Sequence, residues 1–481
     1  MRPSAFNVRV PLPNGEVFLM NTLTDAQAVV STDVVALLDR LDAGEAAGHV
    51  GVQDEHDALE TLARNGFLVR HLASERAALE SYFAEFREDP SQLRITILTT
   101  LQCNFACDYC YQGEHADFGR PAERMSIATA TEVASWVAAQ VEEVRPSRLV
   151  LTFFGGEPLL NVPAMLEIAG RSSKHAASLG VTQMVNIITN GLLLTPRIVE
   201  CMLPLGLTGV KVTLDGDRET HDRMRPLRGG QGTFDRIIEN VRRVAPLVPV
   251  TIGGNFDLDT ADRYPALLDF LKEQDFCGRI SKVVFKPLIK PATPARPAAA
   301  IALRPAEFNR RPLNGGCMTA AGPSTGRSGT PMAGSPCDRC DLLDDKMTSL
   351  RKETERRGFP TPDGLHMGPC EVYRRHSHTI GPDGSLYACP GFTGEFALSV
   401  GHIDGRRQPE HDAAARRFER LAPWRHCGDC PFIPVCGGGC AVAAHAELGD
   451  MDAPSCHKRS LESALASLAE EAAGQQAGGV Q

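Results

Sequence analysis

The sequence predicts an α/β fold with three parts: a partial barrel of six strand–helix units, a small N-terminal α+β module, and a cysteine-rich C-terminal region. Three observations predict it. Strand-like and helix-like patterns alternate from residue 91 to residue 290, apolar residues alternate with polar ones near the N-terminus, and seven of the 15 cysteines follow residue 369. Strands alternating with helices are typical of a parallel sheet covered by helices.

Residues 1–90 predict the N-terminal module. Apolar residues alternate over 6–12, as in a half-buried strand, and Asn14-Gly15 predicts a hairpin to a second strand at 16–20. Apolar periodicity predicts helices at 34–41, 54–64 and 75–88 and a short strand at 67–69. A hairpin, two helices and a strand form a winged-helix-like arrangement.

Residues 91–290 predict the barrel. We expect its strands at 94–99, 149–154, 184–189, 210–214, 248–255 and 282–287. Helical patterns lie between them at 127–141, 197–203, 234–244 and 261–273. Active sites of such sheets lie at the carboxyl ends of the strands, so residues directly after each strand are the functional candidates.

The remaining chain has weaker patterns. Residues 291–345 are rich in Pro, Ala, Gly and Arg, contain Cys317, Cys337 and Cys340, and predict a linker or surface excursion. Residues 346–470 are rich in Gly and Cys, and we expect bound metal to hold them together. Residues 471–481 predict a frayed tail.

Composition excludes several classes of protein. The net charge is -9 without a long basic run, which argues against a nucleic-acid partner. No apolar stretch reaches the roughly 18 residues of a membrane helix, and the N-terminus lacks an apolar signal core. We therefore expect no membrane partner and a cytoplasmic location. Clustered thiols in that reducing compartment indicate zinc or iron–sulfur clusters rather than disulfides.

The first cysteine group follows the first predicted barrel strand. Cys103, Cys107 and Cys110 lie within eight residues. Three thiolates can hold a [4Fe–4S] cluster and leave one of its four irons open to a ligand. A zinc site that lacks its fourth ligand, or a loop of buried thiols, is the alternative interpretation.

This spacing, with Tyr109 before the third cysteine, resembles the signature of the radical S-adenosylmethionine (SAM) superfamily. Gly155-Gly156-Glu157-Pro158 after the second strand resembles the GGEP motif of that family. Thr213-Leu214-Asp215-Gly216 after the fourth strand resembles its SLDG element. The resemblance implies that the open iron binds SAM, and that one-electron reduction yields a 5′-deoxyadenosyl radical that abstracts a hydrogen atom.

The resemblance also implies a set of cofactor-binding residues: Tyr109, Gly155, Gly156, Glu157, Thr213 and Arg225. Backbone at the glycines and Glu157 would meet the SAM ammonium, and Thr213 would hydrogen-bond its carboxylate. Arg225 would pair with a carboxylate of SAM or of the substrate, or it is a solvated surface arginine. No catalytic side chain is assigned.

The C-terminal cysteine spacing resembles the SPASM domain, the auxiliary-cluster module of peptide-modifying radical SAM enzymes. The resemblance assigns one set of thiols to a distal auxiliary cluster: Cys427, Cys430, Cys436 and Cys456. It assigns Cys370, Cys389 and Cys440 to a nearer one, which makes three [4Fe–4S] clusters in all. Cys337, Cys340 or Cys317 would complete the nearer set, or its open iron binds substrate.

Relatives of this type act mostly on polypeptides, so the resemblance implies a precursor peptide or protein substrate and an external electron donor such as flavodoxin or ferredoxin. The N-terminal module would bind the peptide, or it merely packs on the barrel. Formylglycine formation in sulfatases is an alternative, although Pro390 follows Cys389 where that branch has an acid. A non-catalytic electron carrier or peptide-binding scaffold is another.

Four further residues receive expectations. His376 and His378 lie between cluster ligands and would be proton shuttles, or they pack near the cluster or face solvent. Cys201 and Cys277 lie in apolar barrel segments and are expected to be buried small hydrophobes.

Overall fold

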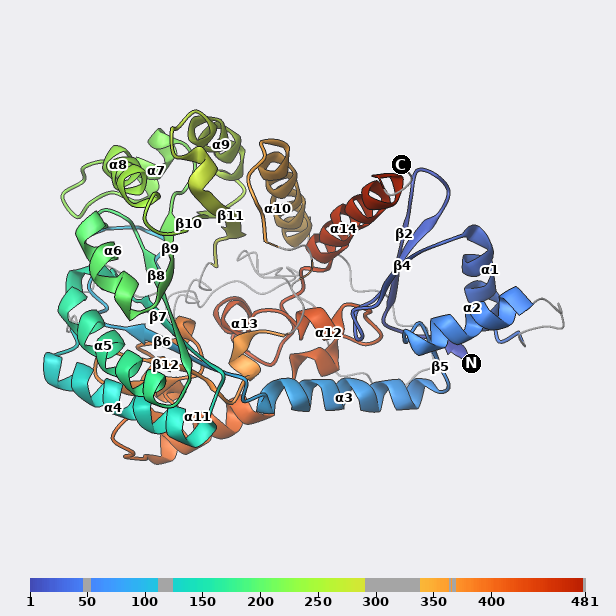
Figure 1. The fold of residues 1–481 in the computed structure, drawn as a ribbon, viewed down its shortest axis with the longest axis horizontal. Coiled ribbons are helices and arrows are strands. Elements are labelled where there is room, and N and C mark those ends of the chain that lie inside the picture. Colours follow the sequence, from blue (N-terminus) through green and yellow to red (C-terminus); the bar gives the residue numbers. More distant parts are fainter. Residues whose placement is uncertain (46–52, 111–123, 290–337, 363–364, 366–368, 479–481) are drawn as a thin grey trace, which may run out of the picture.

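The computed structural model describes residues 1–45, 53–110, 124–289, 338–362, 365 and 369–478 (Figure 1). Six parallel strands of its main sheet follow one another in chain order and form the partial barrel that the sequence predicts. These strands are β6 (Gln92–Leu98), β7 (Arg148–Phe154), β8 (Thr182–Thr189), β9 (Leu207–Thr213), β10 (Val250–Phe256) and β11 (Ile280–Pro287).

Helices cover one face of this sheet. They are α4 (Ile127–Val144), α5 (Val162–Ser178), α6 (Pro196–Met202), α7 (Arg218–Met224), α8 (Phe234–Val244) and α9 (Tyr264–Lys272). Strand residues such as Val210 and Val212 pack with helix residues such as Val133 and Val137 in one apolar cluster, the barrel core. The opposite face of the strands is therefore left for the site.

The main sheet does not stop at the barrel. β12 (Ser377–Ile380) pairs in parallel with β6, and β13 (Ser385–Tyr387) and β14 (Gly401–His402) continue the sheet antiparallel. The sequence did not reveal these strands, because segments of two to four residues are too short to show a period. The C-terminal region is thus joined to the barrel by backbone hydrogen bonds.

The N-terminal module has the predicted hairpin, with Gly15 in its turn at φ +86°. Its elements are β1 (Arg2–Pro3), β2 (Asn7–Pro11), β3 (Val17–Asn21), β4 (Gln27–Val30), α1 (Thr32–Asp42), α2 (Gln53–Arg64), β5 (Leu68–Val69) and α3 (Leu72–Glu88). The sheet order β2-β3-β4 leaves β4 at an edge. The short strands β1 and β4 were not predicted.

Long helices connect the parts. α3 leads from the module toward the barrel along the C-terminal region, where its Phe83 stacks on Trp424 at 3.9 Å between ring centroids (Figure 1). α14 (Lys458–Gly478) packs against Val8 and Leu12 on the other side. The remaining helices are α10 (Asp338–Arg356), α11 (Pro409–Arg420), α12 (Ile433–Cys436) and α13 (Ala441–Leu448).

Two expected boundaries fall inside helices. The boundary expected at 345 lies within α10, and the tail expected to fray from 471 begins within α14. α10 is mostly polar, so the sequence shows little apolar periodicity there. α14 has an apolar stripe that includes Leu461, Leu465 and Leu468, and this stripe was overlooked in the sequence. None of the described helices is long and apolar enough to cross a membrane.

Candidate functional site

Cys103, Cys107 and Cys110 leave the carboxyl end of β6 on one loop. Cys107 is buried and the other two are half-buried. Burial, together with the nearby charges of Glu157 and Cys107, raises the pKa of Cys103 to about 12. Cys107 in turn lies near Cys110. The structure thus gathers the three thiols, although no three His, Cys, Asp or Glu side chains of the described residues lie at single-metal-ion spacing.

Gly155 and Gly156 brace this loop through its backbone. The N–H of Gly156 donates to the carbonyl of Thr100 at 3.0 Å, and the N–H of Glu157 donates to Gln102 at 2.9 Å. A Cβ atom on Gly155 would lie 2.4 Å from Thr100 O, and one on Gly156 would lie 2.2 Å from Gln102 O. Only glycine permits this approach, so the motif holds the strand end of β7 against the cysteine loop.

Glu157 also has a structural role that the sequence did not predict. Its side chain is 0% exposed, and its carboxylate accepts hydrogen bonds from Thr189 Oγ1 at 2.7 Å, the Asn190 N–H at 2.8 Å and the Leu159 N–H at 3.0 Å. The carboxylate is enclosed by these three donors, and its contact with the SAM ammonium stays a prediction. It ties the end of β7 to the end of β8.

Tyr109, Asp215 and Arg225 form a buried network beside the cysteines. The Tyr109 hydroxyl donates to Asp215, and Arg225 donates to both, with 3.3 Å to the Asp215 carboxylate. The Arg225 side chain is 11% exposed, so the surface interpretation is wrong. Burial opposes its charge, but Tyr109, Asp215 and Cys107 raise the pKa of its guanidinium well above the usual value.

The network is anchored to the strand ends behind it. Asp215 also accepts the Asn255 N–H at 2.7 Å, and its own N–H donates to His221 Nδ1 at 3.2 Å. Burial lowers the pKa of His221 well below the usual value, which favours the neutral acceptor. Thr213 ends β9 half-buried, on the face opposite the buried Val212. Asp215 was named from the sequence only as part of a motif, without this role.

Asn190 is a site residue that sequence reasoning missed. Its amide nitrogen lies 2.8 Å from Asn104 Oδ1 and 3.8 Å from Cys103 Sγ. Its position directly after β8 was the available signal. The ends of four successive strands therefore converge on the cysteine loop, and three gathered thiols with an amide donor to sulfur fit a [4Fe–4S] cluster.

The hairpin β12–β13 gathers a second group of thiols. Cys370 precedes it and Cys389 follows it, so the antiparallel pairing returns the chain to the same end. Gly384 makes the turn at φ +91°. Burial raises the pKa of Cys389 to about 12, and Cys370 and Cys440 act on it in the same direction. The structure thus brings together the three thiols expected at the nearer cluster.

The third group combines Cys427, Cys430, Cys436 and Cys456, whose charges act on one another. Three consecutive glycines after Cys436 all have positive φ. A Cβ atom on Gly439 would lie 1.9 Å from Ser455 O, so this loop passes directly against the residue before Cys456. The Tyr373 hydroxyl donates to Gly437 O at 2.9 Å and links the second and third groups.

Other expectations have mixed outcomes. Cys317 and Cys337 lie outside the described residues, and only the helical backbone of Cys340 is described, so the fourth ligand of the nearer set stays open. His378 packs edge-on against Trp136 at 5.2 Å. Cys201 is exposed and Cys277 half-buried, so burial of Cys201 was wrongly predicted: its helix α6 turns it outward.

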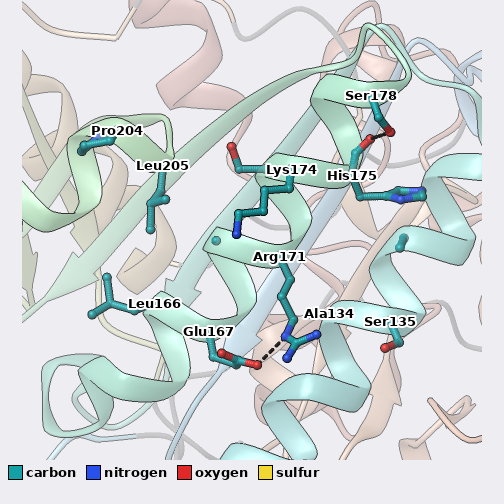
Figure 2. Close-up of a pocket in the computed structure, with 13 residues that line it drawn as sticks. Ala134, Ser135, Leu166, Glu167, Arg171, Lys174, His175, Ser178, Pro204 and Leu205 are labelled. Carbon is teal, nitrogen blue, oxygen red and sulfur yellow. Dashed lines mark hydrogen bonds and ion pairs between the residues drawn. The ribbon is translucent and has the colours of Figure 1, made fainter.

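One groove lies away from these groups. Figure 2 shows it on the outer helices, where Leu166 and Lys174 of α5 face Ala134 of α4 and Leu205. Arg171 pairs there with Glu167. The groove is on the helical side of the sheet, whereas the thiols lie at the strand ends.

Comparisons with known proteins bear on this geometry. Residues 97–271 match the radical SAM superfamily profile. The chain is 25% identical over 222 residues to Fe-coproporphyrin III synthase of Methanosarcina barkeri, covering 43% of this chain and 50% of the relative. It is 26% identical to the sporulation killing factor maturation protein SkfB of Bacillus subtilis, covering 35% of this chain and 36% of the relative. The chain therefore spans half or less of these relatives.

A solved structure shares the fold. Native anSMEcpe with bound AdoMet and Kp18Cys peptide has a TM-score of 0.55 at 16% identity, covering 77% of this chain and 96% of that chain. The assignment of residues 97–271 implies one [4Fe–4S] cluster and SAM. The profile match, the partial barrel and the thiol loop after its first strand agree: residues 97–271 of this chain form a radical SAM domain.

Proposed function

We propose that the protein is a radical SAM maturase that abstracts hydrogen from a residue of a ribosomally made peptide or protein. The observation that carries this proposal is the convergence of four strand ends on the Cys103–Cys107–Cys110 loop. A reduced [4Fe–4S] cluster supplies the electron that cleaves SAM and generates the 5′-deoxyadenosyl radical. A chain with this many cysteines as cluster ligands fits the reducing cytoplasm. An external donor such as flavodoxin or ferredoxin would supply the electron.

The chain's own residues position that chemistry. Glycines 155 and 156 and Glu157 hold the cysteine loop against β7 and β8, so the cluster would keep a fixed place above the sheet. Arg225 and Asp215 hold the Tyr109 ring in the loop between two thiols. Groups fixed before the reaction need no rearrangement during it.

A peptide substrate is supported by three features. The seven C-terminal thiols fall into the two sets that auxiliary clusters would need. β4 pairs with β3 on one side and is an edge of its sheet in the described part of the chain, so an extended peptide could add a strand there. The relative SkfB is named a maturation protein, and the structure of anSMEcpe, which shares the fold, holds a peptide.

The sulfatase-maturing alternative lacks the acid that it would use beside the nearer thiols. Pro390 follows Cys389 and starts a short helical turn, Pro390–Phe392, without an acidic side chain. Crosslinking, oxidation or a similar modification of a peptide is therefore the proposal that we favour.

Anaerobically reconstituted protein tests it. With dithionite and SAM, we expect 5′-deoxyadenosine, and a mass change in a short peptide encoded beside the gene. Cys103→Ala should abolish both products, whereas Cys201→Ala, at an exposed position on α6, should leave both unchanged. Iron analysis should give about twelve irons per chain for three clusters, and about four would remove the auxiliary sets. Nucleoside formation equal in the two variants would refute the proposal.

A further inference from the structure

Lys211 is a cation on the site face of the barrel that the proposed chemistry does not yet use. Its neighbours Val210 and Val212 are buried against the helices, so Lys211 lies on the opposite face of β9. It is half-buried. A Cβ atom on Gly253 would lie 2.4 Å from Lys211 Cε and 3.3 Å from its Nζ. The lysine therefore extends across β10 in space that only a glycine leaves free.

Lys286 places a second cation near the first. It lies in β11 opposite Asn255 of β10, two residues nearer the carboxyl end than the position opposite Gly253. Its charge lowers the pKa of Lys211, after the larger effect of burial. It also acts on the thiol of Cys370. Lys286 thus lies at the side of the barrel that faces Cys370.

Within the described residues, neither lysine has an ion pair or a hydrogen bond with an acid. The closest acids along this edge have other partners. Asp215 is bound by Tyr109, Arg225 and the Asn255 N–H. Glu371, beside Cys370, pairs with Arg94 at 3.6 Å and Arg374 at 3.5 Å.

Lys211 is half-buried and loses solvation, and the charge of the exposed Lys286 repels it, so the charge of Lys211 is unfavourable without an anion nearby. Together these two effects lower the pKa of Lys211 to about 8. A ligand that carries negative charge would offset both effects. Among the side chains and termini of an unmodified peptide, carboxylates are the groups that are fully ionised to anions at neutral pH.

We propose that Lys211 and Lys286 bind a carboxylate of the substrate peptide and so hold it between the radical SAM cluster loop and the nearer auxiliary thiols. This inference rests on the proposed function, in that the substrate is a peptide. The carboxylate belongs either to an Asp or Glu side chain or to the C-terminus of the peptide, and the two sources share the chemistry of recognition.

Small probes on the cluster-loaded, SAM-bound protein separate the sources. N-acetylglutamate N-methylamide carries only a side-chain carboxylate, N-acetylglutamine only a terminal one, and N-acetylglutamine N-methylamide neither. We expect calorimetry to show binding of at least one acidic probe but not of the neutral one. The affinity should fall about tenfold in Lys211→Met and in Lys286→Met, as expected for a lost charge-assisted hydrogen bond.

Further variants test the geometry. Gly253→Ala keeps both charges but displaces the head of Lys211, so it should also weaken binding. Lys272→Met, at the exposed end of α9 on the helical side of the sheet, is the control and should bind like the unaltered protein. A second measurement follows acetylation of Lys211 by mass spectrometry, with exposed Lys174 as internal reference, and the acidic probe should slow it about tenfold.

The proposal is overturned if neither acidic probe binds, or if Lys211→Met and Lys272→Met bind them equally. It is also overturned if both lysine variants lose affinity for SAM itself and not for the probes, because the cations would then serve the cofactor. No radical step enters this assay. Carboxylate binding without SAM cleavage would therefore refute the proposed function but support this site. SAM cleavage without carboxylate binding would refute only the site.

Discussion

The barrel and the C-terminal region hold their cysteines by different means. One continuous apolar cluster of strands and helices fixes the strand ends around Cys103, Cys107 and Cys110. The C-terminal region has strands of two to four residues, and its apolar cluster includes Phe6, Leu79 and Phe83 of the N-terminal module. The comparison indicates that the barrel folds around its own core, and we expect the C-terminal region to depend on the auxiliary clusters that we propose.

The largest expected effect is the response to iron removal. The chain has two tryptophans, Trp136 in α4 of the barrel and Trp424 in the C-terminal region. Trp136 also packs against His378 of β12, so its emission indicates an unfolded barrel only when it reaches that of the urea-unfolded protein. Structural metal sites contribute on the order of 10 kcal/mol. After anaerobic chelation, we expect the fluorescence of Trp136→Phe, which reports Trp424, to show an unfolded C-terminal region, while Trp424→Phe reports a folded barrel. Simultaneous loss of both signals would break the comparison.

The same contrast explains what the sequence could predict. Each barrel strand has seven or eight residues, and one of its faces is buried against the helices, so its apolar periodicity was visible in the sequence. The motifs directly after the strands then located the site. The strands β12–β14 are too short for a period, and their pairing with β6 depends on residues almost 300 positions apart. The cysteine sets were predicted from the spacing of the cysteines, which can be compared with a known family even where the sequence shows no strand or helix periodicity.

Side-chain directions were beyond reach of the sequence. The enclosure of Glu157 arises from Thr189 and Asn190 on another strand, and the path of Lys211 depends on Gly253. Arg225 can be buried because it donates hydrogen bonds to Tyr109 and Asp215. Such contacts join segments distant in sequence, and no local pattern marks them.

The second effect concerns the close approach of β7 to the cysteine loop. Gly156→Ala would place a methyl group against the backbone of Gln102, and we expect the barrel to lose about 3 kcal/mol of unfolding free energy. Gly170→Ala, in the middle of α5 with nothing within 4 Å, should instead gain about 0.5–1 kcal/mol. Urea unfolding of iron-free Trp424→Phe protein measures both. Equal stability of the two variants would contradict the bracing role of Gly156.

A smaller loss is expected at Glu157. Glu157→Gln replaces one accepting oxygen by an amide that cannot accept from Thr189 or Asn190, so it should destabilise the barrel by about 2 kcal/mol. Glu167→Gln is the matched change on the outer surface, where Arg171 is its partner, and should shift stability by less than about 0.5 kcal/mol. The same urea titration distinguishes them, and a neutral Glu157→Gln would show that its carboxylate is dispensable.

The smallest expected effect is on the pH dependence of carboxylate binding. The pKa of Lys211 is lowered to about 8, chiefly by burial, so its charge is present below pH 8 and lost above it. Only about a tenth of Lys211 would carry a proton at pH 9. Probe affinity should therefore fall between pH 7 and pH 9, and calorimetry at several pH values checks this. Affinity that rises over that range would be the contrary result.

Electron paramagnetic resonance of the reduced protein, recorded before and after addition of SAM, tests the central claim most directly. The account predicts that SAM changes the spectrum of one cluster, that the change persists in Cys201→Ala, and that it disappears when Cys103, Cys107 and Cys110 are replaced by alanine. A SAM-dependent change that survives the triple replacement would contradict the assignment of these three thiols.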